Sequence, residues 1–127
     1  MSGLAILDTM NLINAPVYTY AMGLVASMAA VLFTCGEKGH RYMLPNAEVM
    51  IHQPLGGYSG QASDIEIHTK HILNLKRRLY VILANATGKS TKVIEKESDR
   101  DNYMEAPEAI AFGLADQILE KFTQKDV

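Results

Sequence analysis

A regular spacing of apolar residues between Ala62 and Ala86 constrains the fold of this chain most strongly. The intervals alternate between three and four residues, which is typical of a helix that packs along one face. At ~1.5 Å per residue, such a helix is about 37 Å long. That length matches the diameter of a small domain, so part of the helix should project beyond the core. The positions that define the spacing are Ile65, His68, Ile72, Leu75, Leu79, Ile82 and Ala86.

A second apolar strip on the same segment indicates a partner. An amphipathic surface helix needs only one apolar face, and a chain of 127 residues has little sequence left to cover both sides of this helix. We therefore expect the helix to be buried against another subunit. The alternative is a single central core helix within a monomer. The second strip consists of Leu73, Tyr80, Val81 and Leu83.

Short segments with helix and strand signals alternate along the rest of the chain. Apolar residues on one helical face, or capped runs of small residues, predict helices at residues 4–13, 27–35 and 107–113. Runs rich in β-branched and aromatic residues between turn residues predict strands at residues 16–23, 41–44 and 47–52. No linker or repeat interrupts this order. The alternation predicts one domain, residues 1–127, with an α/β layered fold.

Charge and cysteine content exclude several classes of function. Twelve Lys and Arg residues against fourteen Asp and Glu residues give a net charge of -2, which offers no electrostatic case for nucleic acid or an acidic membrane surface. Cys35 is the only cysteine, so neither an intrachain disulfide nor a cysteine-based zinc site can form. No apolar run approaches ~20 residues and no signal peptide is recognisable. We expect a cytoplasmic protein without a membrane span, a bound metal or a cofactor.

Ser27 stands where a predicted strand turns into a helix, and two interpretations of its hydroxyl are open. Its oxygen could accept a hydrogen bond from an N–H group of the helix as an ordinary N-cap. Alternatively, the free N–H groups and positive dipole at a helix start suit a nucleophile. A nucleophile needs a base and an acid, and His52 with a nearby acid could complete a Ser-His-Asp set. Taken alone, the serine favours the N-cap interpretation.

Two long strings resemble the proteolytic subunit of the Clp protease (the ClpP family). They are "ASMAAVLFTCGEKGHRYMLPNAEVMIHQPLGGYSGQASDIEIHTKHIL" and "DRDNYMEAPEAIAFGLADQIL", and the resemblance extends from about Gly3 to Phe122. It implies that Ser27 is the nucleophile, His52 the general base and Asp101 the acid that orients the histidine. It also implies that the backbone N–H of Met28 is one donor of the oxyanion hole.

The resemblance assigns further roles outside this set. The edge segment beside the active site, which pairs with an extended peptide substrate, corresponds to Leu55, Gly56, Gly57 and Tyr58. Asp99 and Arg100 correspond to an ion pair between rings. The fold implied is crotonase/ClpP-like, with a head at residues 1–52 and 98–122. A handle at about residues 53–97 contains the long helix and interdigitates two rings.

Two departures from the family pattern are visible. In the family, an earlier segment supplies strands, an axial loop and a Gly-Gly turn that gives the other oxyanion donor. The present sequence starts at the helix after that turn, so we expect an N-terminally truncated subunit that lacks the N-terminal strands. Ala29 stands where the family commonly has glycine.

The resemblance implies a serine endopeptidase subunit of an ATP-dependent, self-compartmentalised protease. Such subunits form stacked rings, here expected to be heptameric, and degrade unfolded polypeptides that a separate AAA+ unfoldase delivers. ATP belongs to that partner, because this chain has no GxxxxGK[ST] loop. One alternative is a catalytically silent ring or scaffold subunit, because the Gly-Gly segment is missing. Another is an enzyme of the same broad fold, such as an acyl-CoA hydratase.

Overall fold

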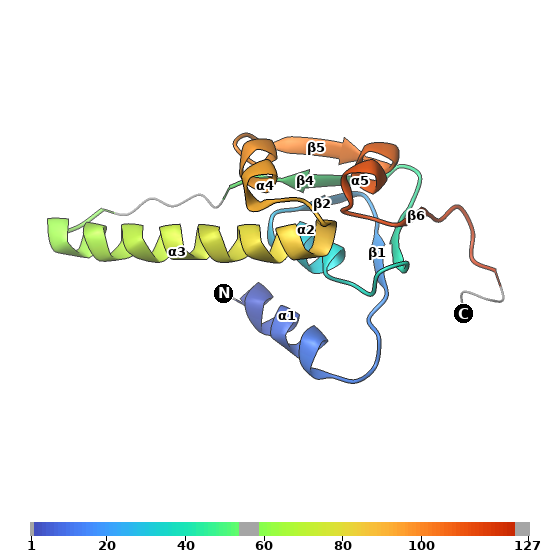
Figure 1. The fold of residues 1–127 in the computed structure, drawn as a ribbon, viewed down its shortest axis with the longest axis horizontal. Helices are drawn as coiled ribbons and strands as arrows, with labels where there is room; N and C mark the ends of the chain where they lie inside the picture. Colours follow the sequence, from blue (N-terminus) through green and yellow to red (C-terminus); the bar gives the residue numbers. More distant parts are fainter. Residues whose placement is uncertain (1, 54–58, 124–127) are drawn as a thin grey trace.

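The computed structural model describes residues 2–53 and 59–123, and in this part of the chain it contains five helices and six short strands (Figure 1). The mixture of helices and sheets confirms the predicted α/β class. In chain order the elements are α1 (Ser2–Leu12), β1 (Thr19–Ala21), β2 (Leu24–Ala26), α2 (Met28–Thr34), β3 (Arg41–Met43), β4 (Glu48–Ile51), α3 (Ala62–Thr87), α4 (Thr91–Glu97), β5 (Asn102–Glu105), α5 (Ala106–Phe112) and β6 (Gln117–Ile118).

The strands form two small sheets. One sheet has the order β1-β3-β6 and is parallel throughout, and the other has the order β2-β4-β5. In the second sheet β2 and β4 are parallel, whereas β4 and β5 are antiparallel. The single strand predicted at residues 16–23 is therefore only partly correct. Gly23, with a φ of 63°, turns the chain from β1 into β2, and the left-handed region it occupies favours glycine.

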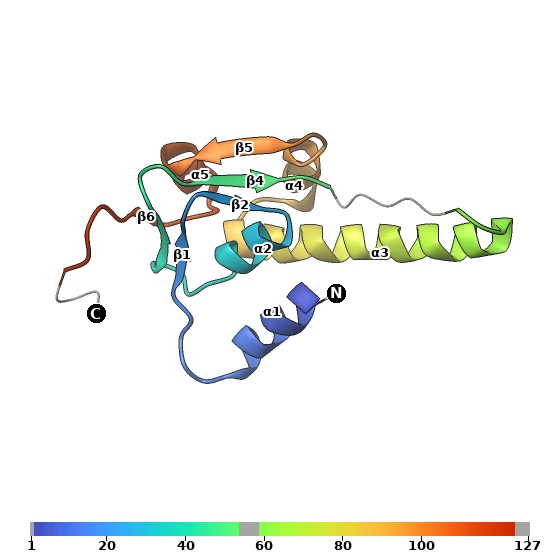
Figure 2. The ribbon, with the colours of Figure 1, turned by 180° about the vertical axis from the view of Figure 1, so that it is seen from behind.

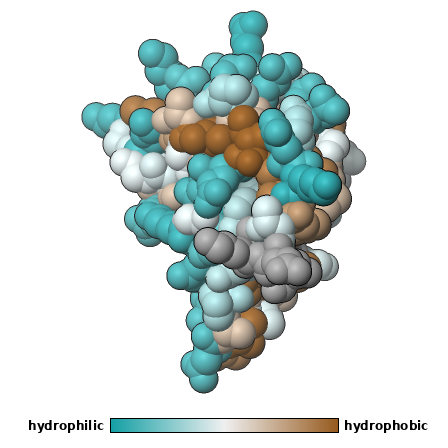
Figure 3. Space-filling view, turned by 90° about the vertical axis from the view of Figure 1, so that its right-hand side faces the viewer, coloured by the Kyte–Doolittle hydropathy of each residue, from teal (hydrophilic) through white to brown (hydrophobic). Residues whose placement is uncertain are grey.

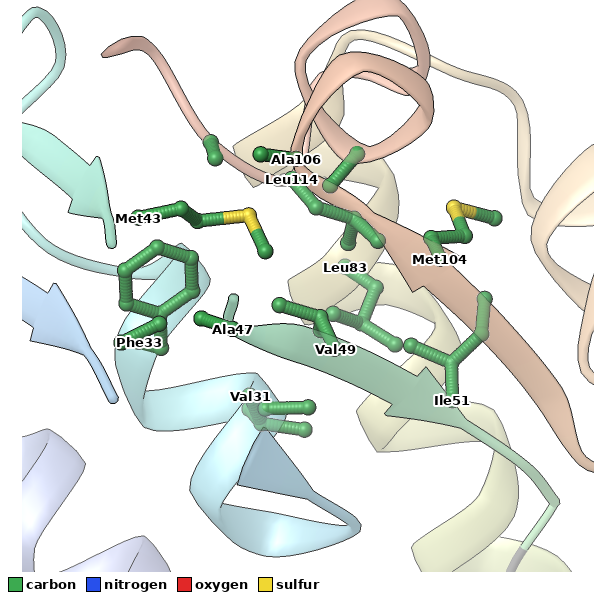
Figure 4. Close-up of a cluster of buried hydrophobic side chains, with 14 of the residues drawn as sticks. Val31, Phe33, Met43, Ala47, Val49, Ile51, Leu83, Met104, Ala106 and Leu114 are labelled. Carbon is green, nitrogen blue, oxygen red and sulfur yellow. The ribbon is translucent and has the colours of Figure 1, made fainter. Parts of the chain in front are cut away.

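The hydrophobic core lies between the sheets and the helices α2, α3 and α5. Figure 4 shows side chains from β4, β5, α2 and α3 converging on one another, with Val49 and Leu83 near the centre. Alternate residues of β4 point into this cluster, as the two-residue period of a strand requires. Leu114 and Ala109 close the core from the α5 side and are fully buried.

The long helix predicted at residues 62–86 is confirmed as α3, which ends at Gly88 with a φ of 75°. Its first half extends away from the sheets, and its last turns pack against α2 and α4 (Figures 1 and 2). The second apolar strip is divided between two environments. Tyr80 and Leu83 are buried within the chain, whereas Leu73 is 50% exposed and Val81 is 48% exposed. Only part of this strip is therefore left for a partner.

Arg41, at the start of β3, joins the C-terminal ends of three helices. Its Nη1 donates hydrogen bonds to the carbonyl oxygens of Thr34, Ala86 and Gly113 at 3.0, 3.1 and 3.0 Å. The rest of the guanidinium forms a two-pronged ion pair with Asp116, at 2.8 and 2.7 Å. The last carbonyl groups of a helix lack partners within the helix, so one buried cation satisfies α2, α3 and α5 together.

Several elements were not predicted. Ser90 is the N-cap of the helix α4, and its hydroxyl accepts a hydrogen bond from the Val93 N–H at 3.2 Å. The strands β2, β5 and β6, of two to four residues each, were not predicted either. Figure 3 shows apolar side chains at the surface opposite the projecting part of α3, where hydrophilic groups surround them. None of the helices within the described ranges is long and apolar enough to cross a membrane.

Candidate active site

The turn between β2 and α2 holds Ser27 in an unusual backbone conformation. Its φ is 58° and its ψ is -125°, and it is the only residue other than glycine with positive φ in the described part of the chain. Residues other than glycine rarely adopt this combination of φ and ψ. The resulting backbone strain persists only where the surrounding structure fixes the conformation. Here the Ser27 N–H donates to the Met50 carbonyl, and the Ser27 carbonyl accepts from the N–H groups of Ala30 and Val31.

The Ser27 side chain does not act as an N-cap. The residue occupies the N-cap position of α2, yet its hydroxyl accepts no hydrogen bond from the helix. Instead, Ser27 Oγ lies 2.5 Å from His52 Nε2. The positive φ turns the side chain away from the helix axis, and this is why the capping interpretation is wrong in spite of a correct position.

His52 directly follows β4, and its second ring nitrogen fixes its tautomer. Nδ1 lies 2.5 Å from the carbonyl oxygen of Gln53. Because a carbonyl oxygen can only accept, Nδ1 carries the proton and Nε2 presents a lone pair. The Ser27 hydroxyl therefore donates to Nε2. A general base that takes the proton of a serine nucleophile requires this tautomer.

Asp101 is where the structure differs from the expectation. Asp101 is exposed, and within residues 2–53 and 59–123 no hydrogen bond or ion pair joins it to His52. The Gln53 carbonyl occupies the position at Nδ1 that the acid was expected to take. The antiparallel ladder of β4 and β5 ends with Ile51 opposite Asn102. Continuing this register by one residue places His52 opposite Asp101, so the two residues are neighbours along the strand pair although no hydrogen bond joins them.

Gln53 is the residue that the sequence did not identify. Its carbonyl accepts from His52 Nδ1, its N–H donates to the Ser98 carbonyl at 2.8 Å, and its Nε2 donates to the Asp99 carbonyl at 3.2 Å. One residue thus joins the histidine to the turn before β5. Two of these contacts are made by main-chain atoms, which any residue type except proline would supply, so the string "MIHQP" contains no signal for them.

A pocket of about 380 Å³ opens beside Ser27 and His52. Apolar side chains from α2, β4 and α3 form most of its wall, and His68 and His71 of α3 add polar groups. A pocket of this kind, apolar with a few polar groups at a reactive pair, is the usual form of a substrate site. The remaining lining residues are Met28, Val31, Ile51, Ile72, Leu75, Leu79, Tyr80 and Leu83.

Met28 is the first residue of α2 and follows the serine. The first N–H groups of a helix have no partner within the helix, and the helix dipole makes that end positive. Its N–H is therefore suited to an oxyanion that forms next to Ser27. The assignment of Met28 as an oxyanion donor stays a prediction.

The remaining residues proposed from the resemblance divide into two groups. Leu55, Gly56, Gly57 and Tyr58 lie outside the described residues. Asp99 and Arg100 are exposed on the turn after α4. The ion pairs among the described residues are Arg41 with Asp116 and Glu66 with Lys70, so a contact of Asp99 and Arg100 with another ring stays a prediction.

The geometry defines a class of site before any comparison is made. A strained serine at a strand-to-helix turn, a histidine in hydrogen-bonding contact and an adjacent apolar pocket are the parts of a hydrolase that uses a covalent intermediate. Comparison with known families gives a more specific result. A family described as Clp protease matches residues 1–122 of the chain. The protein belongs to the Clp protease family, which is a family of peptidases.

Proposed function

We propose that this chain hydrolyses peptide bonds with Ser27 as the nucleophile and His52 as the general base. The observation that carries the proposal is the 2.5 Å contact between Ser27 Oγ and His52 Nε2. The Nδ1 tautomer of His52 and the exposure of Ser27 support it. An exposed hydroxyl can reach a substrate, which a core hydroxyl cannot.

The proposed reaction proceeds in two balanced steps. Ser27 Oγ attacks the peptide carbonyl carbon while its proton moves to His52 Nε2, and the imidazolium then protonates the leaving amine as the peptide bond breaks. Water next attacks the acyl-serine with the same histidine as base, which releases the new carboxyl group. The Met28 N–H would stabilise the oxyanion in both steps, and removal of one such donor typically costs ~100- to 1000-fold in rate.

We propose that Asp101 replaces the Gln53 carbonyl as the partner of His52 Nδ1 in the active state. Asp101 follows the adjacent turn and stands opposite His52 when the register of β4 and β5 is continued. A carboxylate stabilises the imidazolium more strongly than a neutral carbonyl does, because the hydrogen bond is charge-assisted. A rotation of the His52 ring, together with a small movement of residues 98–101, would complete the exchange.

The proposed setting is that of the family. The subunit would form homo-oligomers, stacked heptameric rings, with Asp99 and Arg100 at the contact between rings. Leu55, Gly56, Gly57 and Tyr58 would pair with an extended substrate. A AAA+ unfoldase would use ATP to deliver unfolded polypeptides in the cytoplasm. The exposed Leu73 and Val81 on α3 support a partner on that helix.

One observation favours a second candidate, a catalytically silent ring or scaffold subunit. His52 Nδ1 is held by the Gln53 carbonyl rather than by a carboxylate. If this arrangement persists in the assembled protein, the base has no acid to stabilise its charged form. The family assignment meanwhile favours a peptidase subunit over an acyl-CoA hydratase.

The intact mass of the protein after exposure to a serine-reactive phosphonate tests the proposal. We expect one adduct on Ser27, with the adduct absent in Ser27→Ala and strongly reduced in His52→Ala. A peptidase assay on a fluorogenic peptide should follow the same order. Asp101→Asn is the diagnostic variant, because it keeps the size of the side chain and removes its charge. If Ser27→Ala is labelled as much as the wild type, Ser27 is not the nucleophile. Wild-type protein that forms no adduct would support the silent-subunit candidate.

A further inference from the structure

We infer that Gly3 of α1 determines how large a substrate side chain the pocket accepts, because Gly3 holds Met28 in the pocket wall. The inference rests on the proposed function for its catalytic consequence. Its structural part concerns a contact between the first turn of α1 and the first residue of α2, elements that pack against each other.

The contact between Gly3 and Met28 leaves no space for a methyl group. A Cβ atom at Gly3 would lie 2.1 Å from Met28 Cγ and 3.0 Å from both Sδ and Cε. Non-bonded carbon atoms are ordinarily about 3.5–4.0 Å apart, so any side chain at position 3 would force a movement. The need for glycine here is one of space, because Gly3 is not among the residues with positive φ.

Met28 can relieve this contact by rotation of its side chain. Its side chain is unbranched, with three rotatable bonds and a polarisable sulfur, and it readily changes rotamer. It is half-buried and lines the 380 Å³ pocket beside Ser27. Met28 thus contacts Gly3 and also forms part of the pocket wall. A methyl group at position 3 displaces the Met28 side chain, and we expect the displaced side chain to take up room beside the nucleophile.

The consequence is a change of specificity and not a general loss of reactivity. A substrate with a large apolar side chain needs the full pocket, whereas a substrate with a methyl side chain does not. Gly3 makes no contact with Ser27 or His52 among those that the structure gives, so it is a positioning residue that acts through Met28.

Two diphenyl phosphonates, the analogues of phenylalanine and of alanine, provide the test in Gly3→Ala. In both, Ser27 Oγ bonds to phosphorus, phenoxide leaves and His52 takes the serine proton. We expect the labelling rate with the phenylalanine analogue to fall about tenfold, the order that overpacking one methyl group produces. The rate with the alanine analogue should change less than about twofold, since that side chain leaves the pocket wall untouched.

Two further variants separate this effect from a loss of stability. Gly36→Ala is the matched control, because a Cβ there would lie 2.5 Å from Thr19 Oγ1, and neither Gly36 nor Thr19 lines the pocket. It should leave the ratio of the two rates unchanged. Met28→Ala removes the atoms that Gly3→Ala would strike, so Gly3→Ala should have no further effect on the ratio in that background. An unchanged ratio in Gly3→Ala, or an equal loss with both reagents, would overturn the inference.

The Met28 methyl resonance gives a readout that does not depend on catalysis. With ¹³C-methyl methionine, Gly3→Ala should shift this resonance more than any other methionine methyl, and Gly36→Ala should not. A resonance that stays in place would overturn the structural part of the inference. If wild-type protein reacts with neither phosphonate, the proposed function fails and the methyl resonance alone decides whether Gly3 positions Met28.

Discussion

The strained backbone of Ser27 predicts an unusual result for two substitutions at one position. Ser27→Ala and Ser27→Gly both remove the hydroxyl and its contact with His52, so that loss cancels when they are compared. They differ in backbone conformation, because a φ of 58° with a ψ of -125° is costly for alanine and allowed for glycine. A residue held in a sparsely populated region costs about 1–3 kcal/mol.

The expected difference is smaller than this strain, because glycine also adds freedom to the unfolded chain. That freedom costs roughly 0.4–1 kcal/mol, so Ser27→Gly should be more stable than Ser27→Ala by about 1 kcal/mol. Denaturant unfolding at one protein concentration measures the difference, and the two m-values should agree. Ala26→Gly is the control, since Ala26 lies in β2 with ordinary geometry and should lose about 0.5–1 kcal/mol. An alanine variant as stable as the glycine variant would refute the argument from strain.

Three other predictions concern the core, pH and assembly. Arg41→Met should lower the free energy of unfolding by about 3–5 kcal/mol, because it removes the ionic partner of Asp116 and leaves three helix ends unsatisfied. A loss below ~1 kcal/mol in denaturant unfolding would contradict this. The hydrogen bond from Arg41 lowers the pKa of Asp116 below its usual value of 3.8. The stabilisation by this carboxylate is therefore fully present above that value and is lost as pH falls through the lower pKa of the folded protein; acid titrations of Arg41→Met should lack this component, and identical profiles would count against it. Leu73→Asp should weaken self-association through the exposed strip of α3, and sedimentation of the variant as wild type would remove α3 as an interface.

The sequence was informative where a pattern repeats. The alternating intervals extend from Ile65 to Ala86, most of the 26 residues of α3, so the helix could be predicted almost to its ends. The helix α1 and the strands β3 and β4 were also expected close to where they lie. In contrast, β2 has three residues and pairs with β4 through main-chain atoms, a contact for which side chains give little evidence. The division of the α3 strip into buried and exposed residues follows from the packing of the last turns of α3 against α2 and α4, and α4 was not predicted from the sequence.

In the candidate site, too, contacts made by main-chain atoms could not be predicted from the sequence. Ser27 and His52 were predicted from the resemblance, and a serine hydroxyl beside an imidazole suits the roles of nucleophile and general base. The partner of His52 Nδ1 was not predicted, because it is a carbonyl oxygen of Gln53. Every residue except proline carries the same pair of main-chain groups. A sequence therefore shows which side chains are available, and only the backbone path determines which main-chain group reaches them.

The register of one strand pair explains why Ser27 and His52 meet at all. In the parallel pairing of β2 with β4, Ala26 lies opposite Met50, and the next N–H, that of Ser27, bonds the Met50 carbonyl. The carboxyl ends of parallel strands lie at one edge of a sheet, so the residues that follow β2 and β4 must emerge together there. A slip of one residue would turn every side chain of β2 to the other face and separate the two groups. Gly23 and Ser27, both with positive φ, bound β2 on either side. These two turns fix both ends of β2, which is only three residues long. With both ends fixed, β2 cannot easily shift along β4, and Ser27 and His52 stay side by side.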